Sequence, residues 1–277
     1  MDRSVHSCYN WTMQSNHDVL TALPRDDRLA GRTAWVTGST SGIGEAVAHV
    51  LAASGATVLV SGRDAARAEA VAAAITTAGG AARTLVADLA APPAELRATA
   101  ARAVDLLGGR LDALVNNAGV YPVSATEDLA DDDLEALLAV NVRAPHVLVG
   151  ALAPAMAERG DGVVVDIGSW MARVGSPFGA MYTATKAALE QLTRAWSAEY
   201  GPRGVRVNTV APGATATPGN AEAAAVLEQM TAATVAGRPV RPVDVAFAVR
   251  WLCTDEAAFV HGTTLDVDGG ILAARVG

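Results

Sequence analysis

The sequence predicts an α/β protein whose single domain is a doubly wound sheet of seven parallel strands with helices on both faces. Two observations predict this class. From about residue 32 onward, short runs of β-branched or apolar residues alternate with longer, alanine-rich stretches of helical character. Alternating strands and helices imply parallel strands joined by right-handed crossovers. The chain also has 277 residues, which suits one such domain and is short for two.

The expected elements follow one another along the chain. Strands are expected at residues 33–37, 57–61, 83–87, 113–116, 163–167, 205–210 and 264–267. The clearest helical stretches lie at residues 44–53, 65–78, 134–157 and 181–200. Residues 1–28 are polar and lack a clear period, so we expect a flexible or loosely docked extension ahead of a domain formed by residues 29–277. Ligands of such sheets bind beyond the carboxyl ends of the strands.

Composition narrows the class of protein. Hydrophobic residues make up 51 % of the chain, enough for a large core, and no uninterrupted apolar run is long enough to predict a membrane span or a secretory signal. Cys8 and Cys253 have no spacing typical of a disulfide framework or a metal site, so we expect no metal and a reduced, cytoplasmic setting. A net charge of −8 argues against nucleic acid as a partner.

A glycine-rich turn at residues 37–44, with the sequence TGSTSGIG, ends the first expected strand and opens a helix. Gly38 permits the tight turn, Gly42 lets the backbone approach a pyrophosphate, and Gly44 allows close packing of helix on strand. The N–H groups of the helix N-terminus favour phosphates. A glycine-rich turn without a ligand is the plainer alternative, but its place between strand and helix favours a dinucleotide site at Gly38, Thr40, Ser41, Gly42, Ile43 and Gly44.

The end of the second expected strand favours NADP(H) as the cofactor, with NAD(H) as the alternative. NAD enzymes usually have an acidic side chain here that binds the ribose 2′-hydroxyl group. This chain has Gly62 followed by Arg63, and a guanidinium can pair with a 2′-phosphate. Two other interpretations stay open: Arg63 faces water at a helix start capped by Asp64, or Asp64 turns toward the ribose.

Two further strand ends supply candidate cofactor contacts. Asn117, Ala118 and Gly119 follow the fourth expected strand, where small residues would let the cofactor lie against the backbone. Asp88, beside Leu89 at the end of the third strand, could accept a hydrogen bond from the adenine amino group. The alternative for each is a turn, because Asp and Asn at strand ends are more often turn formers.

The candidate catalytic pair is Tyr182 and Lys186. The chain has twenty arginines and one lysine, so position 186 is expected to need a compact ammonium rather than a planar guanidinium. Lys186 follows Tyr182 by four residues, which puts both on one face of an expected helix. A nearby ammonium is expected to lower the pKa of Tyr182 from about 10, so that the phenol can exchange a proton with a carbonyl or alcohol oxygen. Lys186 would also reach the nicotinamide ribose hydroxyls.

Ser169 ends the fifth expected strand and can hold the substrate oxygen by a hydrogen bond while Tyr182 transfers the proton. With the TGxxxGIG turn, the NNAG segment, the YxxxK motif thirteen residues after Ser169 and the closing DVDGG, residues 29–272 resemble the short-chain dehydrogenase/reductase family. The resemblance implies a Rossmann-type fold and an oxidoreductase that acts on alcohol or carbonyl groups. It also implies a homo-oligomer, a tetramer or a dimer, with the helices at 134–157 and 181–200 in one interface.

The same resemblance assigns roles to residues that the sequence alone would not single out. It implies that Asn141 completes a catalytic tetrad by holding a water that relays protons to Lys186. It also implies that the nicotinamide carboxamide is oriented by the backbone around Thr215 and the side chain of Thr217, which follow Pro212 and Gly213. Most family members have an aliphatic residue where Thr215 stands.

Three functions stay open on the sequence. The leading one is an enzyme for small or medium ketones and alcohols, because the expected pocket segments, 121–123, 170–181 and 213–235, are mostly apolar. The second is reduction of a 3-oxoacyl thioester on an acidic carrier protein, for which Arg159 and Arg203 could build a basic patch. The third is a cofactor-sensing binding protein that has lost catalysis, which the complete tetrad disfavours.

Overall fold

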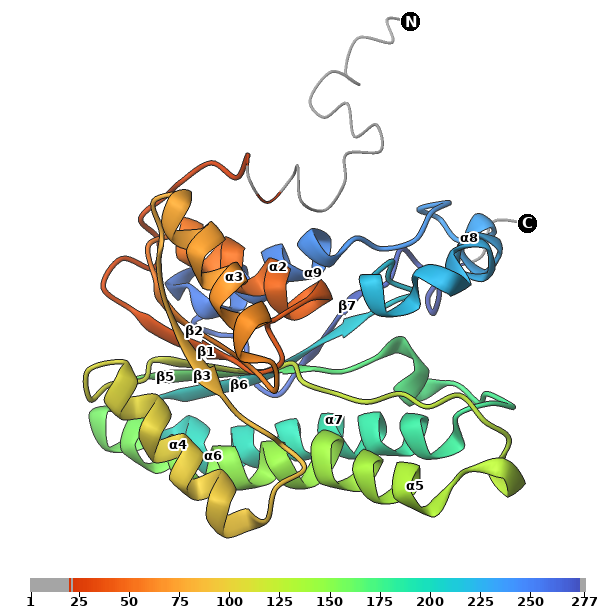
Figure 1. The fold of residues 1–277 in the computed structure, drawn as a ribbon, viewed down its shortest axis with the longest axis horizontal. Helices are drawn as coiled ribbons and strands as arrows, with labels where there is room; N and C mark the ends of the chain where they lie inside the picture. The colour runs from red at the N-terminus through yellow and green to blue at the C-terminus, as the bar shows by residue number, and fades with distance from the viewer. Residues whose placement is uncertain (1–19, 21, 275–277) are drawn as a thin grey trace, which may run out of the picture.

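A computed structural model describes residue 20 and residues 22–274. Its centre is a seven-stranded sheet in the order β3-β2-β1-β4-β5-β6-β7, and every neighbouring pair is parallel. Helices cover both faces of the sheet (Figure 1). The predicted fold class is therefore confirmed.

The strands are β1 (Thr33–Val36), β2 (Thr57–Gly62), β3 (Ala81–Val86), β4 (Ala113–Asn116), β5 (Gly162–Ile167), β6 (Val205–Pro212) and β7 (Thr264–Val267). The helices are α2 (Gly42–Ala53), α3 (Ala65–Thr77), α4 (Pro93–Leu106), α5 (Asp131–Leu138), α6 (Ala144–Arg159), α7 (Ala180–Tyr200), α8 (Ala224–Ala232) and α9 (Pro242–Cys253). Short single turns of helix, among them η3 (Trp170–Arg173) and η5 (Pro218–Ala223), join them.

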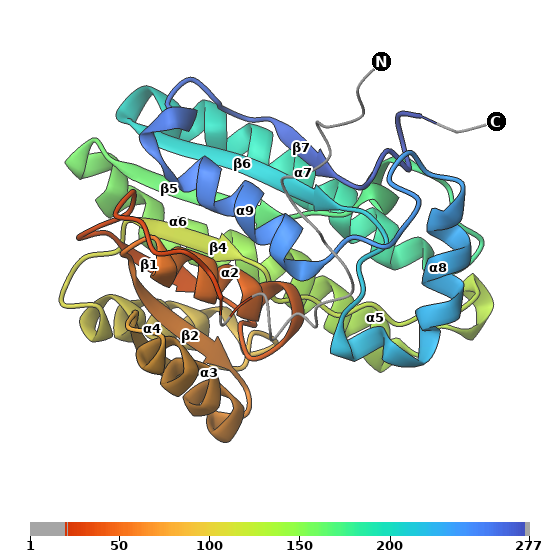
Figure 2. The same ribbon diagram turned by 90° about the horizontal axis from the view of Figure 1, so that it is seen from above.

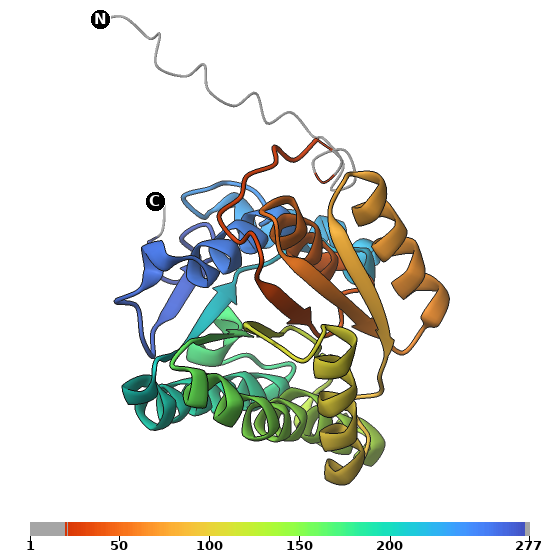
Figure 3. The ribbon, with the colours of Figure 1, turned by 90° about the vertical axis from the view of Figure 1, so that its left-hand side faces the viewer.

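Two hydrophobic cores lie on opposite faces of the sheet. One contains side chains of α2, α3 and α9, and the other contains side chains of α4, α6 and α7. The two helical layers lie on either side of the twisted sheet in an end-on view (Figure 3). Strands covered on both faces are apolar at nearly every position, which explains runs such as 163–165 in β5. The α8 helix lies outside both layers, beyond the sheet (Figure 2).

The helix expected at residues 134–157 runs from Asp131 to Arg159 with one local change of pitch. Residues Ala139–Arg143 between α5 and α6 form a π-helical turn, a feature that often marks functional positions. This continuous helix of 29 residues is long and apolar enough to cross a membrane by length and composition alone, and 56 % of its most apolar window is buried in the protein. This extent of burial is typical of a core helix that packs against the sheet.

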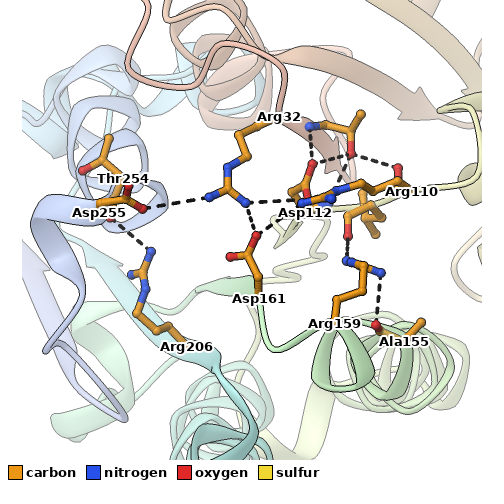
Figure 4. A network of polar contacts seen from close by, with 11 residues as sticks. Arg32, Arg110, Asp112, Ala155, Arg159, Asp161, Arg206, Thr254 and Asp255 are labelled. Carbon is orange, nitrogen blue, oxygen red and sulfur yellow. Dashed lines mark hydrogen bonds and ion pairs between the residues drawn. The ribbon is translucent and has the colours of Figure 1, made fainter.

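An ion-pair network joins the amino ends of three strands, at the opposite end of the sheet from the predicted site (Figure 4). Arg32, just before β1, pairs with Asp161 before β5 and approaches Asp112 before β4. Arg110 contacts Asp112 at 2.5 Å and Asp161 at 3.3 Å. A cavity of about 300 Å³ lies among these residues. The network connects the first residues of strands that are far apart in the sequence.

The last residues of the predicted N-terminal extension are docked on the domain. Leu20 is only 4 % exposed and lies in the core formed with α2, α3 and α9. The Asp26 amide donates to Ala53 O at 3.0 Å, and its carboxylate pairs with Arg250 of α9 at 3.3 Å. The prediction for residues 1–19 and 21 lies outside the described residues.

Candidate active site

Tyr182 and Lys186 lie on the first two turns of α7, directly after Gly179, whose φ of 90° is in the left-handed region open to glycine. Tyr182 shares a hydrogen bond with Ser169 at the end of β5. The Lys186 ammonium is only 5 % exposed, donates to Ile167 O at 2.7 Å and lies 6.0 Å from the centre of the Tyr182 ring. The structure thus brings together the three residues that the sequence predicts at this strand end.

Burial decides the protonation of both groups. It lowers the pKa of Lys186 to about 8, and the negative charge of Asp166 acts in the opposite direction. Burial also raises the pKa of Tyr182, against the effect of its hydrogen bond with Ser169 and together with the effect of Tyr121. The expectation that Lys186 lowers the pKa of Tyr182 is therefore wrong for this arrangement, because desolvation of the phenolate dominates.

Asn141 lies in the π-helical turn and is almost fully buried. Its Oδ1 accepts from Val120 N at 2.9 Å, and its Nδ2 donates to Val120 O at 2.9 Å and to Thr185 Oγ1 at 3.1 Å. The Asn141 side chain therefore fastens the loop after β4 to α7, one residue before Lys186. The water that the family resemblance implies at Asn141 stays a prediction.

The glycine-rich turn after β1 has the shape that a dinucleotide needs. Gly38 and Gly42 have φ values of 62° and 60°. A Cβ on Gly38 would come within 2.8 Å of Ala118 Cα, and one on Gly44 would come within 2.4 Å of Gly38 O. Ser41, the N-cap residue just before α2, makes no side-chain capping hydrogen bond. The first N–H groups of α2 therefore fit a pyrophosphate.

The NNAG segment supports this turn. Asn117 Nδ2 donates to Thr37 O at 2.8 Å and to Gly38 O at 2.9 Å. The amides of Asn117 and Ala118 donate to Thr37 Oγ1 at 3.0 and 3.1 Å. Gly119 lies close to the catalytic residues. A Cβ added to this glycine would be 3.3 Å from Asn141 Oδ1 and 3.6 Å from Lys186 Nζ.

At the end of β2 the structure decides one open question. Asp64 caps α3, accepting from Arg67 N at 3.1 Å, so its carboxylate is engaged at the helix start rather than turned toward a ribose. A Cβ on Gly62 would lie 2.6 Å from Thr40 Cγ2, which leaves no room there for an acidic side chain. Arg63 is exposed.

The other predicted cofactor residues lie along the same edge of the sheet. Asp88 is exposed and accepts from Ala90 N at 2.9 Å, so it forms a turn, while Leu89 is buried in the core. Thr215 is buried with its hydroxyl donating to Gly213 O at 2.9 Å, and the Thr217 side chain would lie 3.5 Å from a Cβ on Gly42. Thr217 therefore reaches the phosphate turn, whereas the Thr215 hydroxyl is already used. Pro212 ends β6 just before them.

The sequence analysis missed Asp166, which is fully buried three residues before Ser169. A carboxylate inside the apolar run Val-Val-Val-Asp-Ile was the available signal, because buried Asp is rare unless it is paired. Burial raises the pKa of Asp166 to about 6. The hydrogen bonds from Thr193 and Asn116 and the charge of Lys186 lower this pKa but do not outweigh burial.

Comparison with known proteins decides the family. The family model for short chain dehydrogenases matches residues 32–227. The chain belongs to the short-chain dehydrogenase/reductase family. A cyclopentanol dehydrogenase of a Comamonas species is 34 % identical over 252 residues, which are 89 % of this chain and 99 % of the relative.

Two solved structures of the family show the same fold. One, from Beutenbergia cavernae, is described as a candidate NAD(P)-dependent gluconate 5-dehydrogenase with bound NADP; it is 39 % identical, has a TM-score of 0.81 and covers 89 % of this chain and 98 % of its own. The other is described as a candidate β-ketoacyl-carrier-protein reductase; it is 43 % identical, has a TM-score of 0.78 and covers 89 % of this chain and 100 % of its own. This chain is therefore an oxidoreductase of the short-chain dehydrogenase/reductase family.

Proposed function

We propose that this protein is an NADP(H)-dependent enzyme that interconverts a ketone or aldehyde and an alcohol, with Tyr182 as the general acid and base. The observation that carries the proposal is the Ser169–Tyr182 hydrogen bond beside the buried Lys186 ammonium. The nicotinamide, when bound, supplies or accepts the hydride.

The chain's own residues handle the proton and the substrate oxygen. Ser169 holds that oxygen next to Tyr182. The raised pKa of Tyr182 keeps the phenol protonated at neutral pH, which is the form that donates a proton to a carbonyl oxygen. Lys186, on the same face of α7, would bind the ribose hydroxyls. This arrangement favours carbonyl reduction at neutral pH and alcohol oxidation at higher pH.

The preference for NADP(H) rests on the end of β2. The carboxylate of Asp64 is engaged as a helix cap, and a side chain at Gly62 would clash with Thr40. Arg63, which is exposed, is the cationic residue nearest to the end of β2 in the sequence. NADP is bound in the structure from Beutenbergia cavernae. NAD(H) is the alternative.

The substrate we propose is a small or medium, largely apolar ketone or its alcohol. Tyr121 meets the Tyr182 ring edge-on at 6.4 Å between ring centres, and its hydroxyl would lie 2.7 Å from a Cβ on Gly219 in η5. Phe178 is 55 % exposed beside the start of α7. An aromatic ring against the catalytic phenol and a second one exposed near the start of α7 fit an apolar or ring-containing substrate.

Reduction of a carrier-bound 3-oxoacyl thioester is the second candidate, favoured by the similarity to a candidate β-ketoacyl-carrier-protein reductase. The basic patch expected for it does not face the site. Arg159 donates to Ala155 O and Leu111 O at the amino end of the sheet (Figure 4). Arg203 stacks on Tyr200 at the far end of α7, which is about 27 Å from Tyr182 at 1.5 Å per residue.

We further propose a cytoplasmic homo-oligomer, a tetramer or a dimer, in which α5 and α6 pack with α7 of a second copy. The four tetrad positions are all filled, which argues against a cofactor sensor without catalysis.

A panel of ketones and alcohols followed by NADPH absorbance, with and without a carrier-bound thioester, tests the function. Tyr182→Phe should abolish turnover while cofactor binding persists. Arg63→Ala should reduce the preference for NADPH over NADH by about 1–3 kcal/mol, as expected for one charge-assisted contact. Equal affinity of the parent protein for both cofactors would refute the cofactor assignment.

A further inference from the structure

A row of buried polar side chains crosses the sheet just below the active site. Asn116 of β4 pairs in register with Asp166 of β5, and Asp166 pairs in register with Thr209 of β6. Thr193 of α7 covers the row. All four residues are at most 3 % exposed, in the middle of a hydrophobic layer.

Hydrogen bonds join the row into one unit. Asn116 Nδ2 donates to Asp166 Oδ1 at 2.8 Å, and Thr193 Oγ1 donates to Asp166 Oδ2 at 2.6 Å. The hydroxyl groups of Thr193 and Thr209 are 2.7 Å apart. Asn116 Oδ1 has no hydrogen-bond partner among the described residues. Hydrogen bonding alone does not require a carboxylate here, because an Asn at position 166 could accept from Thr193 and donate to a flipped Asn116 amide.

The row is joined to the catalytic residues through β5 and through α7. Ser169 follows Asp166 by three residues, just beyond the end of β5, and Lys186 precedes Thr193 by seven residues, two turns along the same face of α7. The Lys186 ammonium donates to the carbonyl of Ile167, the residue next to Asp166. Asp166 and Lys186 are thus two buried opposite charges held against the same strand.

The other ionisable groups near this pair have partners of their own. Glu190 of α7 pairs with Arg173 of η3 at 3.6 Å, and Arg173 also binds Asp266 of β7. Tyr182 of α7 faces Tyr121 from the loop after β4. Asp166 is the one carboxylate whose charge acts on Lys186 among the described residues.

We propose that Asp166 is a positioning residue of the active site, whose buried carboxylate keeps Lys186 charged and holds its ammonium against β5. The inference rests on the proposed function only for its effect on turnover. Two observations support it besides the geometry: the charge of Asp166 raises the pKa of Lys186 against the effect of burial, and that of Lys186 lowers the pKa of Asp166. Each charge therefore stabilises the other where water cannot.

The composition of the chain allows a direct test. Because Lys186 is the only lysine, growth with lysine labelled with ¹³C at Cε gives the untagged protein one side-chain signal, whose shift against pH reports the pKa of Lys186. The parent should titrate at about 8. Asp166→Asn should lower this pKa by roughly one unit or more, as expected for loss of a nearby opposite charge.

Two variants separate charge from structure. Thr193→Val removes a hydrogen bond from the row and leaves the charge, so the pKa of Lys186 should not fall. The double variant Asn116→Asp with Asp166→Asn moves the carboxylate to the next strand, and the pKa should return to within about half a unit of the parent value, since the charge stays in the row. If Asp166→Asn does not fold, the double variant alone tests the inference. A pKa of Lys186 near the parent value supports the inference, and a lower pKa overturns it.

Activity supplies the second measurement. Lys186 loses its charge as pH rises, and kcat/KM for carbonyl reduction should fall with it. In Asp166→Asn this fall on the basic side of the pH profile should occur at a lower pH than in the parent or the double variant. An unchanged pKa and an unchanged limb in Asp166→Asn would overturn the inference and leave the proposed function intact. A protein without activity on any carbonyl in which Asp166→Asn still lowers the pKa of Lys186 would overturn the function instead.

Discussion

Lys186→Met should abolish activity and make the protein more stable at neutral pH. Burial lowers the pKa of Lys186 from 10.5 to about 8, and at about 1.4 kcal/mol per unit this shift corresponds to about 3 kcal/mol of destabilisation by the charged form. Methionine carries no charge and fits an apolar environment. The lost hydrogen bond to Ile167 O offsets about 1 kcal/mol. A net gain of about 2 kcal/mol should raise Tm by roughly 4–8 °C in a domain of this size.

The pH dependence of this gain gives the decisive assay. The folded-state pKa of Lys186 lies below its unfolded value, so the destabilising effect of the charge is complete below about pH 8 and absent above about pH 10.5. Thermal unfolding of parent and variant should therefore differ most at pH 7 and lose that difference near pH 11. A variant that is less stable than the parent at pH 7, or a gain that is the same at both pH values, would refute the reasoning.

Three further predictions follow from the same contacts. Lys186→Arg should lose most activity, measured with saturating cofactor after a folding check, because the wider guanidinium cannot occupy this buried space or lose its charge; full activity would contradict the steric argument. Deleting residues 1–27 should lower Tm by several degrees through loss of the buried Leu20 and the Asp26–Arg250 pair, with cofactor affinity unchanged in a fluorescence titration; an unchanged Tm would show that the docking contributes nothing. Asp112 has a lowered pKa because its hydrogen bonds with Thr33 and Arg110 outweigh burial, so Asp112→Asn should destabilise the fold by about 1–3 kcal/mol in urea at pH 7 and by less as pH falls below about 4; the same loss at both pH values would contradict this.

Features that depend on short stretches of sequence were predictable. The seven strands appear as β-branched or apolar runs between turns, and the glycine-rich turn has a positive φ at Gly38, where the sequence predicts a tight turn. The Tyr182–Lys186 pair needs only one helix to bring both residues together. The confirmed fold and the assembled Ser169–Tyr182–Lys186 site rest on such local patterns.

Features that depend on burial or on register between distant strands were not predictable. The row beneath the site exists because Asn116, Asp166 and Thr209 meet in register across three strands, and no one segment shows this. The direction of the Tyr182 pKa shift follows from how deeply the folded chain covers the phenol. Asn141 resembles any helical residue in sequence, and only the π-helical turn distinguishes it.

The single lysine of this chain is explained by the two opposing demands on position 186. The site needs a cation that is small enough to lie between β5 and Gly119, where Lys186 Nζ would be 3.6 Å from a Cβ on that glycine. The core around it disfavours any charge, which is why the pKa of Lys186 falls to about 8. Arginine would meet neither condition, since it is broader and stays charged. A buried carboxylate on the same strand reduces the conflict without removing it, so we expect stability and activity to oppose each other at Lys186 more than elsewhere in the fold.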